Sequence, residues 1–263
     1  MFQVAKSMAL RVFPDSAIRI ARRGHLAVHI YYGAIIRWQQ TKRRSRSSAR
    51  KVFSEIYHKN LWGGTGRELY SGPGSRYEPA ALYLKTIIEF IKANRISTVL
   101  DLGCGDFVIG KEIAAVCDVY TGVDVVPELI ERNTQIFGSD RIQFICLDVA
   151  FDKLPDAQLC LIRQVLQHLS NEEILRVLAQ VRKYPHLIIT EHYPSNPRSY
   201  NIDQVHGAGT RVENGSGVYL DKAPFNATKL ELLAEMPPMT PSKSGEIQMR
   251  RDWGLIRTYK VTL

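Results

Sequence analysis

Short apolar runs alternate with amphipathic segments along the central part of the chain. The apolar runs are continuous and rich in valine, leucine and isoleucine, which is typical of strands covered on both faces. The segments between them place apolar residues on one side at helical spacing. Five strands are predicted, at residues 98–102, 119–124, 142–147, 159–162 and 187–190. This alternation predicts an α/β fold with a doubly wound, mostly parallel sheet and helices on both faces.

Signals at the ends of the amphipathic segments predict where several helices begin. Serine followed three residues later by glutamate is the capping-box pattern, and it precedes two apolar helical runs. The two pairs are Ser75 with Glu78 and Ser170 with Glu173. A third helix is predicted from Pro127 to the residue before Gly138, because proline favours the first helical turn and glycine follows the last. A fourth is predicted over 107–116.

The pattern is different after the fifth strand. A helix is predicted near residues 228–235, and segments 246–250 and 255–263 are predicted to form an antiparallel strand pair. A glycine-rich loop and a helix precede the first strand. We therefore expect a main domain at 60–263 and assign residues 1–59 to a separate extension.

The chain has a net charge of +9, and its basic excess lies in one segment. Residues 1–60 carry 13 lysines and arginines against two acidic residues. We expect a basic helical extension, with a helix at 16–39 and a polar linker at 41–51. Four interpretations are open: a solvated surface, an interfacial helix on an anionic membrane, a mitochondrial-type presequence, or a nucleic-acid contact. Nucleic acid ranks last, because no recognised nucleic-acid module accompanies the charge.

The composition, 45% hydrophobic and 23% charged, is that of an ordinary globular protein. The cysteines at 104, 117, 146 and 160 form no CxxC pair, so we expect reduced thiols and no metal site. The longest apolar run, residues 26–36, is shorter than the roughly 20 residues that span a bilayer. We expect a cytoplasmic protein, with peripheral contact on the inner face of the membrane as an open alternative.

Polar residues gather where three of the predicted strands end. The first strand runs into Asp101-Leu-Gly-Cys-Gly-Asp106, the second ends at Asp124, and Asp148 follows the third. In a doubly wound sheet these ends lie along one edge, where ligands bind. The two glycines allow a sharp turn and a close approach of the backbone to a ligand. An aspartate after the second strand can accept hydrogen bonds from both hydroxyls of a ribose.

Two nucleotide ligands compete for this arrangement, and the residues favour one of them. A dinucleotide site expects the pattern G-x-G-x-x-G, but the third glycine position is occupied by Val108. Asp101 and Asp106 would repel a pyrophosphate, whereas they would attract the ammonium group of an amino-acid ligand. The electrostatics therefore favour S-adenosylmethionine over a nicotinamide dinucleotide.

Together these motifs resemble the successive motifs of class I S-adenosylmethionine-dependent methyltransferases. The matching segments are 99–106, 122–124, 147–149 and 165–169. The resemblance covers about residues 75–263, and it implies a Rossmann-like, seven-stranded sheet that ends in an antiparallel strand pair. One departure is Phe107, which stands where the family often has a further glycine.

The resemblance also implies which residues hold the methyl donor. They are Asp101, Gly103 and Gly105 for the methionine part, Asp124 for the ribose, and Asp148 with Val149 for the adenine, together with Cys104, Val125 and Gln164 in the same pocket.

The flanking segments are similar to a subgroup of bacterial methyltransferases, some of which lie among genes for surface polysaccharides. The shared features are Trp62-Gly63, the loop 71–75, and Asp203, Gly209, Arg211 and Pro224-Phe225. By analogy, the acceptor is expected to be a hydroxyl of a sugar or glycolipid.

Methylation of a hydroxyl needs a general base near neutral pH, and histidine is the usual choice. His192, at the end of the fifth strand, is the preferred candidate. His168 is a second, with a packing role equally open, and His206 is a third. Arg211 is predicted either to hold an anionic acceptor or, equally, to pair with a surface acid, and Tyr193 is predicted to contact the acceptor. Two alternatives stay open: an N- or C-methyltransferase for another small molecule, and a non-catalytic donor-binding module that acts through its basic extension.

Overall fold

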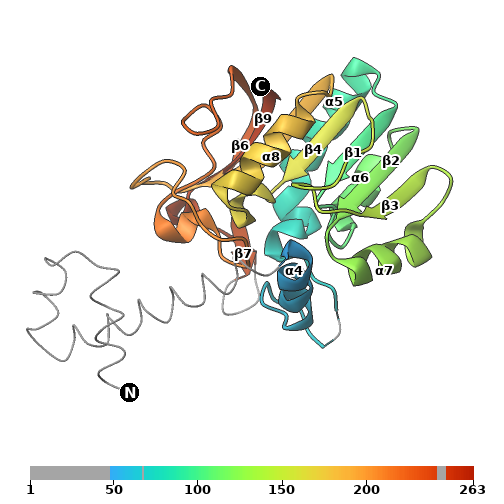
Figure 1. The fold of residues 1–263 in the computed structure, drawn as a ribbon, viewed down its shortest axis with the longest axis horizontal. Helices are drawn as coiled ribbons and strands as arrows, with labels where there is room; N and C mark the ends of the chain where they lie inside the picture. The colour runs from blue at the N-terminus through green and yellow to red at the C-terminus, as the bar shows by residue number, and fades with distance from the viewer. Residues whose placement is uncertain (1–47, 67, 242–246) are drawn as a thin grey trace, which may run out of the picture. The chain divides into compact units, whose positions relative to one another are not determined.

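The computed structural model describes residues 48–263, except for residue 67 and residues 242–246 (Figure 1). The predicted helix at 16–39 and most of the basic linker lie outside the described residues. Residues 48–263 form one compact unit. Within them, no helix is long and apolar enough to cross a membrane.

A seven-stranded sheet forms the centre of this unit, with the strand order β3-β2-β1-β4-β5-β9-β6. Its strands are β1 (Thr98–Leu102), β2 (Val119–Asp124), β3 (Ile142–Cys146), β4 (Leu159–Arg163), β5 (His186–Tyr193), β6 (Lys229–Met236) and β9 (Leu255–Thr262). The first five are parallel, and β9 is antiparallel to both of its neighbours, β5 and β6. The predicted Rossmann-like α/β fold, with a mostly parallel seven-stranded sheet and an antiparallel C-terminal pair, is confirmed.

The order of the strands reverses between β1 and β4. From β1 the chain continues outward to β2 and β3, and it then returns to place β4 and β5 on the other side. At such a switch point the loops after the two central strands diverge and leave a crevice at their carboxyl ends. This arrangement brings the turn after β1 and the ends of β2 and β4 around one opening.

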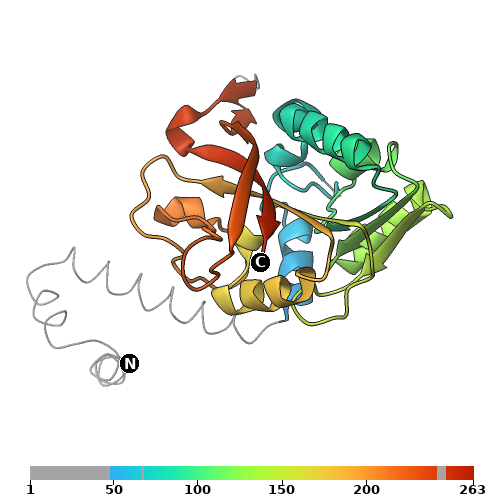
Figure 2. The same cartoon turned by 90° about the horizontal axis from the view of Figure 1, so that it is seen from above.

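Helices cover both faces of the sheet (Figure 2). They are α4 (Ala49–His58), α5 (Tyr77–Asn94), α6 (Val108–Ala114), α7 (Pro127–Phe137) and α8 (Asn171–Val181). Helices α5 and α6 bury Ile87 and Ile113 with Val99 of β1 in one core. Helices α4, α7 and α8 pack with Leu100 and Leu102 in the other. Successive residues of β1 therefore enter opposite cores, as a strand buried on both faces requires.

The predicted helix starts hold at α7 and α8 but not at α5. Ser170 and Glu173 form the predicted capping box at α8. At α5 the cap residue is Arg76, which makes no side-chain cap hydrogen bond. The Ser75 hydroxyl instead donates to the Gly72 carbonyl oxygen at 2.7 Å. The capping box predicted from Ser75 is therefore wrong, because the preceding loop engages that hydroxyl.

The helix predicted near residues 228–235 is also wrong, since this segment is the edge strand β6. Its leucine, alanine and glutamate residues favour a helix locally, but its backbone pairs with β9. The register shifts between Leu232 and Ala234, which interrupts the alternation of buried and exposed side chains that marks a strand.

The last strand, β9, therefore has a different partner from the predicted one. β9 pairs with β6 rather than with residues 246–250. Residues Ile247–Met249 form β8, which pairs with β7 (Met239–Pro241) in a separate two-stranded sheet.

Helix α4 packs into the compact unit, although residues 1–59 were predicted to form a separate extension. It buries Ala49, Phe53, Ile56 and Tyr57, and these residues join the core on the α7 and α8 face. The compact unit begins at Ser48 rather than at residue 60. The basic residues between the apolar positions obscured this buried stripe, because their charge dominates the segment.

Replacement of Ile56 by alanine in the full chain is expected to lower the free energy of unfolding by about 2–5 kcal/mol, since its side chain is 3% exposed. The matched change Lys51→Ala removes an exposed side chain from the same helix and should cost less than about 0.5 kcal/mol. Urea unfolding curves measure both. Equal effects would mean that α4 does not stabilise the domain.

Candidate functional site

A cavity of about 810 Å³ lies at the carboxyl ends of the central strands. Its walls come from the turn after β1, from α4 and the loop that follows it, from the loop after β5, and from the segment before β9. The predicted site residues that line it are Asp101, Gly103, Cys104, Gly105, Asp124, Val125, Asp148, Val149, Gln164, His168 and His192. The structure thus gathers residues from distant parts of the sequence around one space large enough for a small-molecule ligand.

The turn after β1 requires glycine at its first position. Gly103 has a φ of +79°, and a Cβ there would overlap the side chain of Val165. Its N–H group donates to the Val123 carbonyl oxygen at 2.7 Å, which fixes the turn against β2. Any other residue would strain the backbone and displace Val165, so glycine keeps this part of the cavity open to a ligand.

Phe107 stands where the resemblance leads us to expect a further glycine. It keeps the left-handed backbone that glycine favours, with a φ of 64°, and it is the cap residue of α6. Its buried ring packs against Tyr120, Phe137 and Phe144, with centroid distances of 5.3, 5.1 and 4.8 Å. Phe107 therefore fills the core beneath the turn and keeps the backbone conformation that a glycine would have.

Two aspartates, the buried Asp101 and the half-buried Asp124, make one end of the cavity acidic. Asp101 accepts a hydrogen bond from the Tyr120 hydroxyl at 2.6 Å. The Asp124 carboxylate accepts from the N–H groups of Gly105 at 3.2 Å and Val126 at 3.1 Å. Burial raises the pKa of each carboxyl group to about 6. Carboxylates that lose hydration in this way are stabilised by a cationic ligand, so this end of the cavity favours one.

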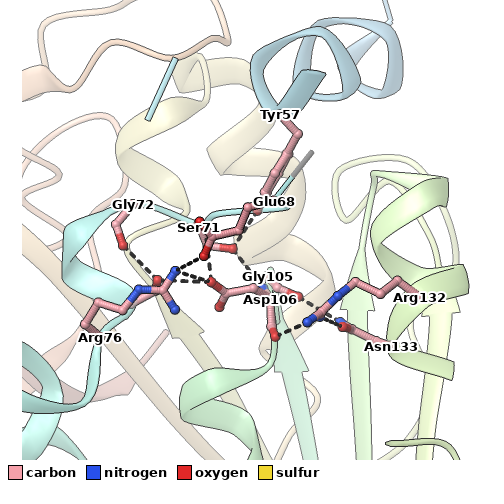
Figure 3. A network of polar contacts seen from close by, with 10 residues as sticks. Tyr57, Glu68, Ser71, Gly72, Arg76, Gly105, Asp106, Arg132 and Asn133 are labelled. Atoms are coloured by element: carbon pink, nitrogen blue, oxygen red, sulfur yellow. Dashed lines mark hydrogen bonds and ion pairs between the residues drawn. The ribbon is translucent and has the colours of Figure 1, made fainter. Parts of the chain in front are cut away.

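Asp106 ties the glycine turn to the loop before α5 (Figure 3). Its carboxylate accepts from the Ser71 N–H at 3.3 Å and pairs with Arg76 at 3.2 Å. Its own N–H donates to the Ser71 hydroxyl at 2.8 Å, and that hydroxyl lies 2.8 Å from the hydroxyl of Tyr57 on α4. Asn133 of α7 donates to a carbonyl oxygen of the turn at 2.8 Å. The turn is therefore held by α4, α7 and the loop before α5.

Trp62 lines the cavity, although its sequence context did not predict a place in the site. Its indole N–H donates to the Ala208 carbonyl oxygen at 3.1 Å. Its ring lies 5.1 Å from the ring of His168 and 5.3 Å from that of Tyr57, between centroids. Trp62 thus connects α4 to the loop after β5, and no local sequence pattern marks such a contact.

His192 and His168 both line the cavity, and both are held by backbone carbonyl groups. The His192 Nε2–H donates to the Trp253 carbonyl oxygen at 2.9 Å, and burial lowers the pKa of this imidazole. The His168 Nδ1–H donates to the carbonyl oxygens of Gly207 at 3.2 Å and Gly209 at 3.3 Å. Burial lowers the pKa of His168 to about 4. Because carbonyl oxygens only accept, the second ring nitrogen of each neutral imidazole carries a lone pair.

Three predicted residues lie outside the cavity lining: His206, Arg211 and Tyr193. His206 Nδ1 is 2.7 Å from a carboxylate oxygen of Glu173. Arg211 is 1% exposed and donates to the Leu169 carbonyl oxygen at 2.7 Å. The Tyr193 hydroxyl donates to a backbone carbonyl oxygen at 3.0 Å. The polar groups of Arg211 and Tyr193 bond to backbone carbonyl oxygens in this structure, and the roles of the three residues toward the acceptor stay predictions.

Comparison with known proteins identifies a methyltransferase domain within the chain. Residues 99–184 match the family model of the methyltransferase domain. The N-methyltransferase NodS from Bradyrhizobium japonicum, solved with S-adenosyl-L-homocysteine, is 15% identical; the match covers 81% of this chain and 100% of that chain, with a TM-score of 0.54. The 1,6-didemethyltoxoflavin-N1-methyltransferase from Burkholderia thailandensis is 17% identical over 81% of this chain and 87% of that chain, with a TM-score of 0.47. No curated protein sequence matches the chain.

The matched segment carries the glycine turn, Asp124 and Asp148, and NodS has the same fold over most of this chain. The open glycine turn and the acidic end of the cavity fit a ligand that carries an amino-acid part, a positive charge and a ribose. S-adenosylmethionine is therefore the methyl donor, and residues 99–184 are a methyltransferase domain on a fold that NodS shares.

Proposed function

We propose that the protein methylates a hydroxyl group of a sugar or glycolipid, with His192 as the general base. The observation that carries this proposal is the setting of His192, a neutral imidazole fixed by the Trp253 carbonyl in the same cavity as Asp101 and Asp124. A hydroxyl is a weak nucleophile until its proton is removed, so this acceptor needs a base of that kind.

The donor occupies the acidic end of the cavity in this proposal. Gly103 and Gly105 would hold its methionine part with Asp101 facing the ammonium group, Asp124 would hold the ribose, and Asp148 the adenine. When bound, the donor supplies an electrophilic methyl group on a positively charged sulfur that is its own leaving group. The chain contributes mainly alignment, because the glycine turn and the strand ends are fixed before the ligand arrives.

His192 accepts the proton of the acceptor hydroxyl at Nδ1. Its Nε2–H stays bonded to the Trp253 carbonyl oxygen, which stabilises the imidazolium that forms. Strand β5, which carries His192, pairs with β4 on one side and β9 on the other. A base on a strand held at both edges keeps its position better than one on a free loop.

Trp253 provides a surface for the acceptor beside the base. Its side chain is 46% exposed and lines the cavity. The Arg250 guanidinium lies 4.3 Å from the centroid of its ring and forms two hydrogen bonds with the Asp252 carboxylate, at 3.0 and 2.7 Å. A fixed aromatic ring can pack against the C–H face of a sugar, while Asn196 and Thr210 of the same cavity can contact its hydroxyls.

The acceptor is tested by incubating the full chain with methyl-labelled S-adenosylmethionine and matched sets of glycosides, glycolipids and small amines. Label is expected on a sugar hydroxyl. The change Trp253→Ala should raise KM for that acceptor about tenfold and leave the Kd of S-adenosylhomocysteine unchanged, because the ring lies at the acceptor end.

The exposed residue Leu232, on the edge strand β6, offers a matched control, and Leu232→Ala should change neither constant. Label on an amine, with none on sugars, would replace this proposal with an N-methyltransferase. Donor binding without any methyl transfer would favour a donor-binding module.

A further inference from the structure

Arg163 is a cation in the cavity to which the proposed mechanism gives no task. It is the last residue of β4 and lines the cavity together with Gly74, Tyr83 and Asp101. An arginine side chain stays charged in a protein under all ordinary conditions. A partly buried cation therefore needs either a protein counter-ion or a ligand.

The protein satisfies only part of this guanidinium. Its Nη2 donates to the Gly74 carbonyl oxygen at 2.6 Å, and its centre lies 5.0 Å from the centroid of the Tyr83 ring. Its Nε is buried and has no hydrogen-bond partner. Within the part of the chain that the structure describes, no carboxylate oxygen lies within 4.0 Å of it. The group keeps unused donors next to the cavity.

Asp101 carries the opposite charge on the neighbouring strand. β1 and β4 are adjacent and parallel, and Asp101 pairs in register with Leu161, two residues before Arg163. Both residues line the same cavity and act on each other electrostatically, but no nitrogen of Arg163 lies within 4.0 Å of the Asp101 carboxylate. Opposite charges held apart on one wall suit a ligand that carries both charges close together, and an α-amino-acid group is such a ligand.

A second arginine near the turn, Arg76, is less suited to this task. Its guanidinium pairs with the carboxylates of Asp106 at 3.2 Å and Glu68 at 3.5 Å. It is absent from the lining of the cavity. Arg76 therefore fixes the loop before α5, and Arg163 is the arginine whose donors remain for a ligand.

We propose that Arg163 binds the α-carboxylate of the donor's methionine part, while Asp101 faces its ammonium group. This inference rests on the donor site described above and is independent of the acceptor. It assigns to β4 a binding residue that lies outside the glycine turn. It also explains why an arginine is buried beside an aspartate without pairing with it.

Calorimetry with two ligands tests the contact. One ligand is S-adenosylhomocysteine, and the other is its decarboxylated analogue, which keeps the amine and lacks the carboxylate. The change Arg163→Gln should raise the Kd of S-adenosylhomocysteine about 10- to 100-fold, as expected for loss of hydrogen bonds to a charged group. It should leave the Kd of the decarboxylated analogue within about twofold, because that ligand has no carboxylate to lose.

Two further variants keep the test decisive. Arg163→Lys retains the charge without the planar fork, and it should weaken only S-adenosylhomocysteine, by a smaller factor. Arg76→Gln should affect both ligands to the same extent, because Arg76 acts on the loop. Equal losses for both ligands in both Arg163 variants would overturn the inference and leave the donor site standing. Failure of the wild-type chain to bind S-adenosylhomocysteine would overturn the inference and the donor site together.

Discussion

Replacing His192 with glutamine is expected to lower kcat for a hydroxyl acceptor by about 10²- to 10⁴-fold, the usual contribution of a general base. Glutamine keeps an N–H group that can donate to the Trp253 carbonyl oxygen, so the local structure is preserved while the basic nitrogen is lost. The Kd of S-adenosylhomocysteine should not change. A matched control is His186→Gln, at the other end of β5 and outside the cavity lining.

The pH dependence of kcat gives this prediction a second readout. Burial lowers the pKa of His192, so the neutral base is present at neutral pH and becomes protonated only as the pH falls below its ordinary value of about 6.5. With saturating donor, kcat should fall on acidification with a midpoint below that value, and the His192→Gln protein should lack this limb. Full activity in the variant, or an unchanged pH profile, would exclude His192 as the base.

The gathering of the predicted donor residues in one cavity could be predicted from the sequence, because these residues follow directly from the strands that position them. Asp101, Gly103, Asp124 and Asp148 stand at or just beyond the ends of three apolar runs, and parallel strands bring such ends to one edge. The register of the sheet brings two of these residues close together, since Asp101 pairs with Gly122 of β2, two residues before Asp124. The position of these residues at the strand ends was therefore enough to predict that they lie around one cavity.

Other parts of the cavity lining could not be predicted in this way, because their side chains are placed by contacts between distant segments. Trp62 depends on the loop after β5, and His192 depends on a carbonyl of the segment before β9. For the same reason the sequence did not show that polar residues of that loop lie outside the cavity lining. Arg211 and His206 resemble site residues in the sequence, but their partners are other parts of the fold.

The basic charge of α4 and the helix propensity of β6 each led to a wrong assignment of that element. The basic residues of α4 hide a stripe that includes Phe53 and Ile56, so the helix was grouped with the extension although it forms a wall of the cavity. The segment of β6 has good helix formers, and only pairing with β9 makes it a strand. In both cases burial against a distant partner outweighed the local signal.

Replacing Asp124 with asparagine is expected to raise the Kd of S-adenosylhomocysteine about 10- to 100-fold, because a charged acceptor for the ribose hydroxyls becomes a neutral one. The side-chain oxygen of asparagine can still accept from the N–H of Gly105 or Val126, so the turn should survive. Asp118→Asn is the matched control, since Asp118 is exposed just before β2. Calorimetry at pH 7.5 measures both. An unchanged affinity in Asp124→Asn would mean that the ribose does not bind at Asp124.

The same carboxylates make donor binding depend on pH, with a sign that follows from their raised pKa values. Asp101 and Asp124 have pKa values of about 6, so each is mostly ionised at neutral pH and mostly protonated at pH 5. Because the ligand needs the ionised forms, affinity should fall as the pH drops through 6, by about tenfold per carboxylate at pH 5. Asp124→Asn leaves Asp101 as the one titrating group of this pair, so its affinity should fall about tenfold less than that of the wild type over the same range. A steeper or equal fall in the variant would show that Asp124 does not titrate against the ligand.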